Sequence, residues 1–222
     1  MNLFIDQLHI TVPTLYTPIL SIPKLFIPSA QQVAILGPSG SGKTTLLNAI
    51  SGLIDLSANQ LLWDNTDLSQ LSANKRDQWR FEHIGIVMQD FHLTQGLTAL
   101  ENVLLPYYFL HGTSPRGVKQ RAVELLKQMN FQRIESKTEV LSRGEMQRVS
   151  IARALLTHPN IIIADEPTAS LDAENSEMIT ALLKELVEQA GCTLIISTHD
   201  QHLAQQMQRR IYLQNGQIQY EN

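Results

Sequence analysis

The sequence predicts an α/β fold, in which a mostly parallel sheet is covered on both faces by helices. Apolar runs at 33–36, 84–88, 161–164 and 193–196 have the length and composition of buried strands. Segments with helical periodicity separate several of these runs, as expected for parallel strands joined by helical crossovers. The 222 residues suffice for one large domain or two modest lobes.

An antiparallel β part and a helical part are expected beside this sheet. Residues 1–32 alternate apolar and polar positions between prolines, which confine strands to edges or short pieces. We therefore expect a small antiparallel sheet there, and a further short strand at 60–63. The pattern is helical from Phe91 to about Gln132 and again at 145–156. The middle of the chain is thus predicted to be a helical insertion.

The last third continues the alternation of helix and strand. Apolar residues at helical spacing from Met178 to Val187 predict an amphipathic helix before the 193–196 strand. Asn215 and Gly216, between apolar segments, are typical of a two-residue hairpin turn. Cys192, the single cysteine, is expected to fill the core ahead of a strand, and a lone cysteine fits a reducing compartment.

A glycine-rich segment joins the 33–36 run to a predicted helix. It reads Gly37-Pro38-Ser39-Gly40-Ser41-Gly42-Lys43-Thr44-Thr45. Strand, glycine loop and helix form the phosphate-binding P-loop, whose backbone N–H groups converge on an anion. We expect Lys43 to reach the outer phosphates of a nucleotide and the Thr44 hydroxyl to bind Mg²⁺. The alternative, a Gly/Ser surface turn, matches the fixed positions by chance in roughly one chain in a hundred.

An acidic pair ends the 161–164 run. Asp165 lies at the edge of a parallel sheet where ligands bind, so it is expected to be a metal-side ligand, directly or through water. Glu166 has the right side chain to orient or deprotonate an attacking water. The alternative is that the two acids merely end a strand before the turn at Pro167.

The motifs occur in the order found in ATP-binding subunits of ABC transporters, and this resemblance covers nearly the whole chain. The matching segments are 37–45 (Walker A), Gln89 (Q-loop), Leu141-Ser142-Arg143-Gly144-Glu145 (signature), 161–166 (Walker B), Ser170-Leu171-Asp172 (D-loop) and His199 (switch histidine). The resemblance implies a RecA-like P-loop NTPase fold with ATP and Mg²⁺ as cofactors. It also implies one domain, residues 1–222, with a nucleotide-binding core of 1–90 and 156–222 and a helical subdomain of about 91–155.

The resemblance assigns a role to each matching residue. Gln89 would bind the metal or water, and Glu166 would be the catalytic carboxylate. His199 would donate a hydrogen bond to the γ-phosphate, although a lone histidine after a strand is more often structural. Ser142 and the backbone at Gly144, before a helix start, would grip the γ-phosphate of ATP. Asp172 of the D-loop is also assigned to nucleotide binding.

The sequence departs from the family pattern at several positions. Arg143 replaces a usual glycine; it is bulky where the backbone must approach closely, yet its charge could face a phosphate. Glu145 replaces the usual glutamine. The family's aromatic residue that stacks on adenine should fall near Thr14, where this sequence has none. Tyr16 is the nearest candidate for that contact, and the equal alternative is that it is only a packed turn residue.

The expected partners follow from the resemblance. One Walker A and one signature per chain imply a head-to-tail homodimer with two sandwiched ATP molecules. The segment 97–106 resembles the corresponding segment in the branch of lipoprotein-release and macrolide-export ATPases. Members of that branch pair with an integral membrane permease that has a large external domain, so the resemblance implies such a partner here. Tyr107, Tyr108 and Phe109 lie where such subunits receive their membrane partner, but ordinary core is equally compatible.

Charge and hydropathy set the expected location. The net charge is −4, so no basic field recruits nucleic acid. No secretory signal and no membrane-spanning run are evident. The resemblance implies a cytoplasmic protein, peripheral on the cytoplasmic face of the inner membrane. Weaker alternatives are a low-turnover regulatory subunit, a soluble ABC-type ATPase of DNA repair or translation, and a P-loop kinase.

Overall fold

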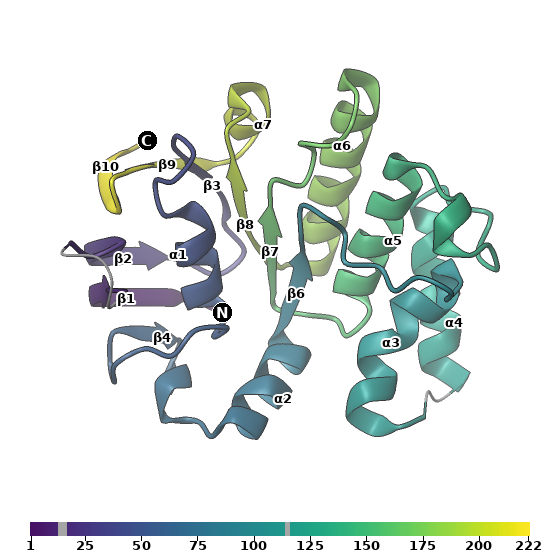
Figure 1. Ribbon diagram of the computed structural model, residues 1–222, viewed down its shortest axis with the longest axis horizontal. Coiled ribbons are helices and arrows are strands. Elements are labelled where there is room, and N and C mark those ends of the chain that lie inside the picture. The colour runs from purple at the N-terminus through teal and green to yellow at the C-terminus, as the bar shows by residue number, and fades with distance from the viewer. Residues whose placement is uncertain (13–16, 114–115) are drawn as a thin grey trace.

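The computed structural model, which describes residues 1–12, 17–113 and 116–222, is built on two sheets, the smaller of which lies at one end of the molecule (Figure 1). A four-stranded sheet has the order β2-β1-β4-β5, and a six-stranded sheet has the order β10-β9-β3-β8-β7-β6. The strands are β1 (Leu3–Ile10), β2 (Leu20–Ile27), β3 (Gln32–Leu36), β4 (Leu61–Trp63), β5 (Thr66–Asp67), β6 (Ile84–Val87), β7 (Ile161–Asp165), β8 (Thr193–Thr198), β9 (Arg209–Gln214) and β10 (Gln217–Glu221).

The six-stranded sheet is parallel except at one edge. Strands β9, β3, β8, β7 and β6 pair in parallel, and β10 pairs antiparallel with β9. The β9–β10 hairpin turns at Asn215 and Gly216, both of which have the positive φ that such turns need. The smaller sheet is antiparallel. The prediction of an α/β fold with an N-terminal antiparallel part is confirmed.

Helices cover the sheets and connect the parallel strands. They are α1 (Lys43–Ile50), α2 (Ala73–His83), α3 (Ala99–His111), α4 (Arg116–Gln128), α5 (Arg143–Leu155), α6 (Ala173–Ala190) and α7 (Gln201–Gln205), with 3-10 turns at Leu68–Gln70 and Thr138–Val140. In Figure 1, α3, α4 and α5 lie together at the end of the molecule opposite β1 and β2. No helix of the described ranges combines the length and apolar character needed to cross a bilayer.

The central strand β3 contributes to two hydrophobic cores. Val33 and Ile35 pack into the core that the two sheets share with α1, whereas Ala34 and Leu36 pack into the core under α3–α6. Successive side chains of a strand point to opposite faces, so an apolar run without alternation fits a strand buried on both sides. Cys192 lies buried just before β8, as the sequence predicts.

The helical prediction is wrong for residues 91–98. Phe91 and His92 have left-handed φ values of 59° and 46°, which a helix cannot accommodate. Helix α3 begins at Ala99, after a capping box in which Thr98 accepts from the Glu101 N–H at 3.2 Å. Helix α2 is not predicted from the sequence, because it buries none of its residues and has no apolar stripe.

The tight contact between β6 and α5 generates a prediction. A Cβ atom at Gly85 would lie 2.2 Å from the Ala154 carbonyl oxygen and 2.6 Å from Ile162 Cδ1. We expect Gly85→Ala to lower the free energy of unfolding by about 2 kcal/mol or more through overpacking. Gly117→Ala in α4 is the control, since no atom lies within 4 Å of its Cβ position. Equal denaturation midpoints for both variants and the parent would contradict this account.

Candidate functional site

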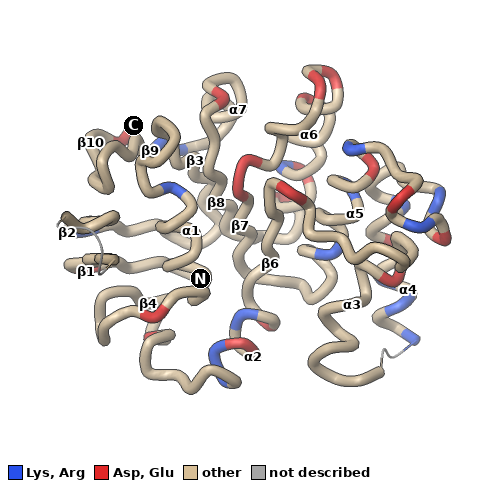
Figure 2. Tube along the Cα trace, in the orientation of Figure 1, with Lys and Arg blue, Asp and Glu red and all other residues tan. Residues whose placement is uncertain are grey.

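The carboxyl ends of four neighbouring parallel strands gather the predicted site residues. In sheet order, β3 leads into the glycine loop, β8 into His199, β7 into Asp165 and Glu166, and β6 into Gln89. This edge of an open parallel sheet is where ligands bind in α/β proteins. Figure 2 shows acidic positions where β7 ends and a basic position on α1, on either side of the site.

A cavity of about 560 Å³ opens at this edge. Its lining combines the glycine loop with side chains from the other strand ends. It consists of Ser39, Gly40, Ser41, Gly42, Lys43, Thr44, Gln89, Asp165, Glu166, Ala169 and His199. The structure therefore brings together most of the predicted Walker A residues, with Gly37, Pro38 and Thr45 at the ends of the loop, and the predicted metal and catalytic residues.

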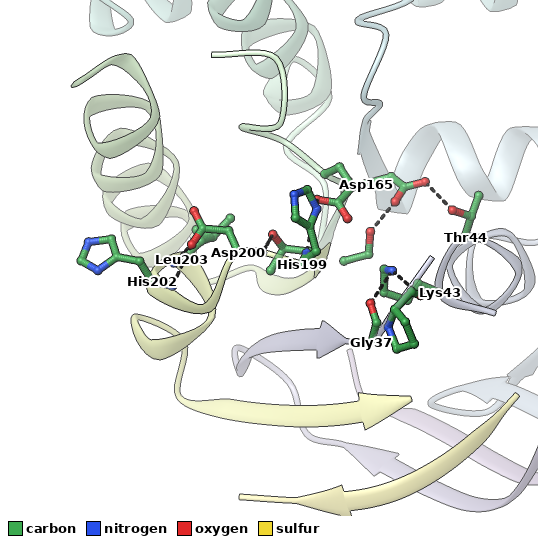
Figure 3. A network of polar contacts seen from close by, with 12 residues as sticks. Gly37, Lys43, Thr44, Asp165, His199, Asp200, His202 and Leu203 are labelled. Atoms are coloured by element: carbon green, nitrogen blue, oxygen red, sulfur yellow. Dashed lines mark hydrogen bonds and ion pairs between the residues drawn. The ribbon is translucent and has the colours of Figure 1, made fainter. Parts of the chain in front are cut away.

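The loop backbone requires glycine at two positions. A Cβ atom at Gly37 would lie 2.1 Å from the Leu213 carbonyl oxygen. Gly42 precedes the first residue of α1 with φ of 102°, a conformation that L side chains rarely adopt. The Lys43 ammonium group donates to the carbonyls of Gly37 at 2.8 Å and Pro38 at 3.2 Å. Its positive charge and the α1 N-terminus thus face the same loop (Figure 3).

Two hydroxyl groups hold the Asp165 carboxylate. The Thr44 hydroxyl donates to Oδ2 at 2.9 Å, and the Ser197 hydroxyl donates to Oδ1. Figure 3 shows the side chains of Thr44 and Asp165 pointing toward each other across the site. Asp165 belongs to β7 and Thr44 to α1, so this contact joins the phosphate loop to the carboxylate that the sequence predicts to lie beside the metal.

The donor set fits Mg²⁺. The ion prefers oxygen ligands and keeps several waters, so it needs few protein groups beside the phosphates of a nucleotide. Thr44 and Asp165 supply a hydroxyl and a carboxylate that already contact each other, and the Gln89 amide lines the same cavity. Thr44, Asp165 and Gln89 are therefore the residues that would hold the metal, as the sequence predicts.

Glu166 and His199 form a second polar pair. The His199 Nδ1 atom lies 2.9 Å from Glu166 Oε2, and 69% of the histidine side chain is exposed against 14% of the glutamate. Glu166 has a left-handed φ of 46°, and its N–H donates to the Ser197 carbonyl oxygen at 3.0 Å. A carboxylate held in this way at the cavity wall can accept a proton from a water placed beside it.

The predicted signature residues lie outside this cavity. Ser142 is the N-cap of α5, and its hydroxyl accepts from the Glu145 N–H at 3.3 Å while Glu145 accepts from the Ser142 N–H at 2.8 Å. Burial tends to raise the pKa of Glu145, but the hydrogen bonds from Ser142 and the charge of Arg133 outweigh it and lower the pKa. In the part of the chain that the structure describes, neither Ser142 nor Gly144 lines the cavity.

The predicted D-loop residue lies beside the signature. Asp172 caps α6 by accepting from the Asn175 N–H at 2.9 Å, a hydrogen bond that lowers the pKa of Asp172. A Cβ atom at Gly144 would lie 3.3 Å from Asn175 Oδ1, so the N-termini of α5 and α6 are close. Asp172 does not line the cavity within the described ranges. Tyr16, the candidate adenine contact, lies outside the described residues.

Two arginines of α5 contact the segment that follows Gln89. The Arg153 guanidinium donates to the carbonyl oxygens of Phe91 at 2.5 Å and His92 at 2.7 Å, which are the two residues with left-handed φ. The Arg143 guanidinium lies over the Phe91 ring, 5.6 Å from its centroid. One helix therefore holds both the signature and the loop after Gln89.

Comparison with known families identifies the chain. The model of the ABC transporter family matches residues 20–169, which include the glycine loop, the signature and the β7 acids. The chain belongs to the ABC transporter family. The predictions of an ATP-binding subunit, ATPase activity and the cofactors ATP and Mg²⁺ are thereby confirmed at the level of the family.

Individual members of the ABC family agree over nearly the full length. The lipoprotein-releasing system ATP-binding protein LolD of Idiomarina loihiensis is 42% identical over 189 residues, which cover 85% of this chain and 82% of the relative. The dimeric ATP-binding cassette MJ0796 of Methanocaldococcus jannaschii, in a post-hydrolysis state bound to ADP and Pi, has a TM-score of 0.89 at 37% identity and covers 99% of this chain and 97% of its own. CbiO1 of Clostridium perfringens, part of the ABC transporter complex cbiONQ, has a TM-score of 0.86 at 28% identity. The match covers 99% of this chain and 87% of the CbiO1 chain.

Two contacts of this ABC ATPase escape prediction from the sequence. Ser197 lies in β8 after three apolar residues and contacts Asp165, which lies 32 positions earlier. Arg153 contacts backbone carbonyls 61 and 62 positions earlier. A hydroxyl residue directly after an apolar run is the only signal that the sequence offers for Ser197. The Arg153 contact leaves no sequence signal, because every residue has a backbone carbonyl group.

The position of Lys43 in this ABC ATPase generates a prediction. Lys43→Ala removes the ammonium group that faces the phosphate loop, so we expect ATP affinity to fall by about 100-fold or more. Lys24→Ala, on an exposed strand position, is the matched control. Isothermal titration with MgATP measures both variants. An ATP dissociation constant for Lys43→Ala equal to that of Lys24→Ala would argue against the site.

Proposed function

We propose that this chain works as a head-to-tail pair that closes on two MgATP molecules and drives a membrane partner. One observation carries the proposal: the cavity holds the loop, metal and catalytic residues, whereas Ser142 and Gly144 lie outside it at the start of α5. A second copy that placed these two residues against the γ-phosphate would complete the site. The dimeric MJ0796 cassette, bound to ADP and Pi, supports the pairing of two copies by similarity.

The chain's own residues would perform the hydrolysis as follows. Bound Mg²⁺ would neutralise charge on the phosphate oxygens. Lys43 and the loop N–H groups would orient the phosphates, and Glu166 would accept the proton of the attacking water. His199 would position Glu166 through its 2.9 Å contact. Its predicted hydrogen bond to the γ-phosphate requires the other ring nitrogen or release from Glu166.

A groove on the neighbouring surface suits a membrane permease. It has a volume of about 420 Å³ and lies between α2, β6 and α5; Leu53, Phe81, Met88, His92, Pro106 and Arg153 are among its lining residues. The predicted aromatic segment directly follows Pro106 of the groove lining: Tyr107 packs against the lining residue Phe81 with ring centroids 5.8 Å apart, and 83% of Phe109 is exposed. An apolar groove with exposed aromatic residues nearby is typical of a protein interface.

The branch and location complete the proposal. Similarity to the lipoprotein-releasing system ATP-binding protein LolD supports a role in extraction or export. The partner would be an integral membrane permease with a large external domain, as the resemblance of 97–106 to this branch implies. The chain would then lie on the cytoplasmic face of the inner membrane. The helical part, about 91–155, would be the subdomain that meets the permease, and 1–90 with 156–222 the nucleotide-binding core.

Nucleotide-dependent pairing tests the proposed function. Glu166→Gln keeps the side-chain shape but removes the proton acceptor, so we expect MgATP to trap a dimer that light scattering detects after gel filtration. Glu188→Gln, at an exposed position of α6, is the control and should remain in exchange between monomer and dimer. A Glu166→Gln variant that stays monomeric with saturating MgATP, with and without the permease, would overturn the proposal.

A low-turnover regulatory subunit is the second candidate, and Arg143 favours it. The family usually has a glycine at position 143. Here the contact of Arg143 with Phe91 joins the signature to the loop after Gln89. This alternative expects Arg143→Gly to raise kcat several-fold, and Arg143→Lys, which keeps the charge but loses the planar guanidinium, to change it less. Steady-state ATPase rates decide: an unchanged or lower kcat in Arg143→Gly would reject the low-turnover alternative.

A further inference from the structure

The Ser197 hydroxyl is buried in β8, whose centre is apolar and whose two end residues, Thr193 and Thr198, are buried threonines. Ser197 is fully buried in β8, and the three residues before it, Leu194, Ile195 and Ile196, are at most 1% exposed. Burying a hydroxyl group is unfavourable unless it finds a hydrogen-bond partner. The partner of Ser197 is the Asp165 carboxylate, which lies directly opposite it in the parallel register of β7 and β8.

The contact fixes both acids at the end of β7. The Ser197 hydroxyl donates to Asp165 Oδ1, and its carbonyl oxygen accepts from the Glu166 N–H at 3.0 Å. Thr44 donates to the other carboxylate oxygen, Oδ2, at 2.9 Å. With Oδ1 bound to the strand, the carboxylate plane cannot rotate freely, and Oδ2 stays on the side of the phosphate loop.

We propose that Ser197 is a positioning residue for the metal. Its hydroxyl orients the Asp165 carboxylate so that Oδ2 and the Thr44 hydroxyl are presented together to Mg²⁺ bound with the nucleotide. A charge-assisted hydrogen bond of this kind is among the stronger polar contacts in proteins, and its loss would leave Asp165 free to adopt other orientations. The inference rests on the proposed function, because it takes Asp165 to be the metal-side carboxylate.

The inference predicts a loss that is confined to the Mg²⁺-dependent part of ATP binding. In Ser197→Ala the hydroxyl is lost but the buried position stays filled by a small apolar side chain, so folding is expected to survive. The ATP dissociation constant measured in EDTA, divided by the constant measured in Mg²⁺, should fall by about tenfold relative to the parent protein. ATP affinity in EDTA should stay unchanged, which a merely structural role of Ser197 would not produce.

A matched control and a double variant sharpen the test. Ser150→Ala removes an equally buried hydroxyl group, on α5, that has no hydrogen-bond partner among the described residues, and should leave the ratio unchanged. Because Ser197 is proposed to act through Asp165, adding Ser197→Ala to Asp165→Asn should reduce the ratio no further. Fluorescence titration of ATP with the whole protein, with Mg²⁺ or with EDTA, measures every variant.

The possible outcomes separate the inference from the proposed function. If the parent protein shows a large Mg²⁺-dependent gain in ATP affinity and Ser197→Ala keeps it, the positioning role is overturned and the ATPase proposal stands. The positioning role is likewise overturned if Ser197→Ala loses equal affinity in Mg²⁺ and in EDTA, or if its effect adds fully to that of Asp165→Asn. If the parent protein shows no gain with Mg²⁺, the proposed metal site itself fails.

Discussion

The hydrogen bond between Thr44 and Asp165 joins the two halves of the nucleotide site within one chain. Thr44 lies in α1, after β3, and Asp165 is the last residue of β7; the two strands are not neighbours, because β8 lies between them in the sheet. The contact therefore depends on three parallel strands that end at the same level. The buried apolar faces of these strands fix that level, and so the hydrophobic core positions the polar site.

The loop after β6 lies between the nucleotide site and the proposed docking groove. Gln89 lines the nucleotide cavity, whereas Met88 and His92 line the groove. Arg153 of α5 also lines the groove and holds the carbonyl oxygens of Phe91 and His92. A partner seated in the groove would thus contact the side chain that sets the loop's conformation, only a few peptide units from Gln89.

Much of the site could be predicted because its chemistry depends on short local patterns. The glycine loop and the acids at the end of β7 each follow an apolar run, the histidine follows β8, and parallel strands place their carboxyl ends together. The strands 33–36, 161–164 and 193–196 could be predicted equally well, since each is buried on both faces and reads as a continuous apolar segment.

The remaining features depend on contacts that no local pattern encodes. The segment 91–98 is kept out of the helix by the Arg153 contact, by the positive φ of Gly96 and by a capping box at Thr98, so the helix begins at Ala99. Helix α2 lacks an apolar stripe. The partner of Ser197 is visible only once the register of β7 and β8 is known.

The central claim is that the phosphate loop of one copy faces the signature of another. Cross-linking between two single-cysteine variants, Ser39→Cys and Ser142→Cys, tests it most directly when both carry Cys192→Ser, which keeps the hydrogen bond to the Pro159 carbonyl oxygen. We expect a disulfide-linked dimer only in the mixture of both variants and only with MgATP. A link that forms equally in either variant alone, or without nucleotide, would contradict the account.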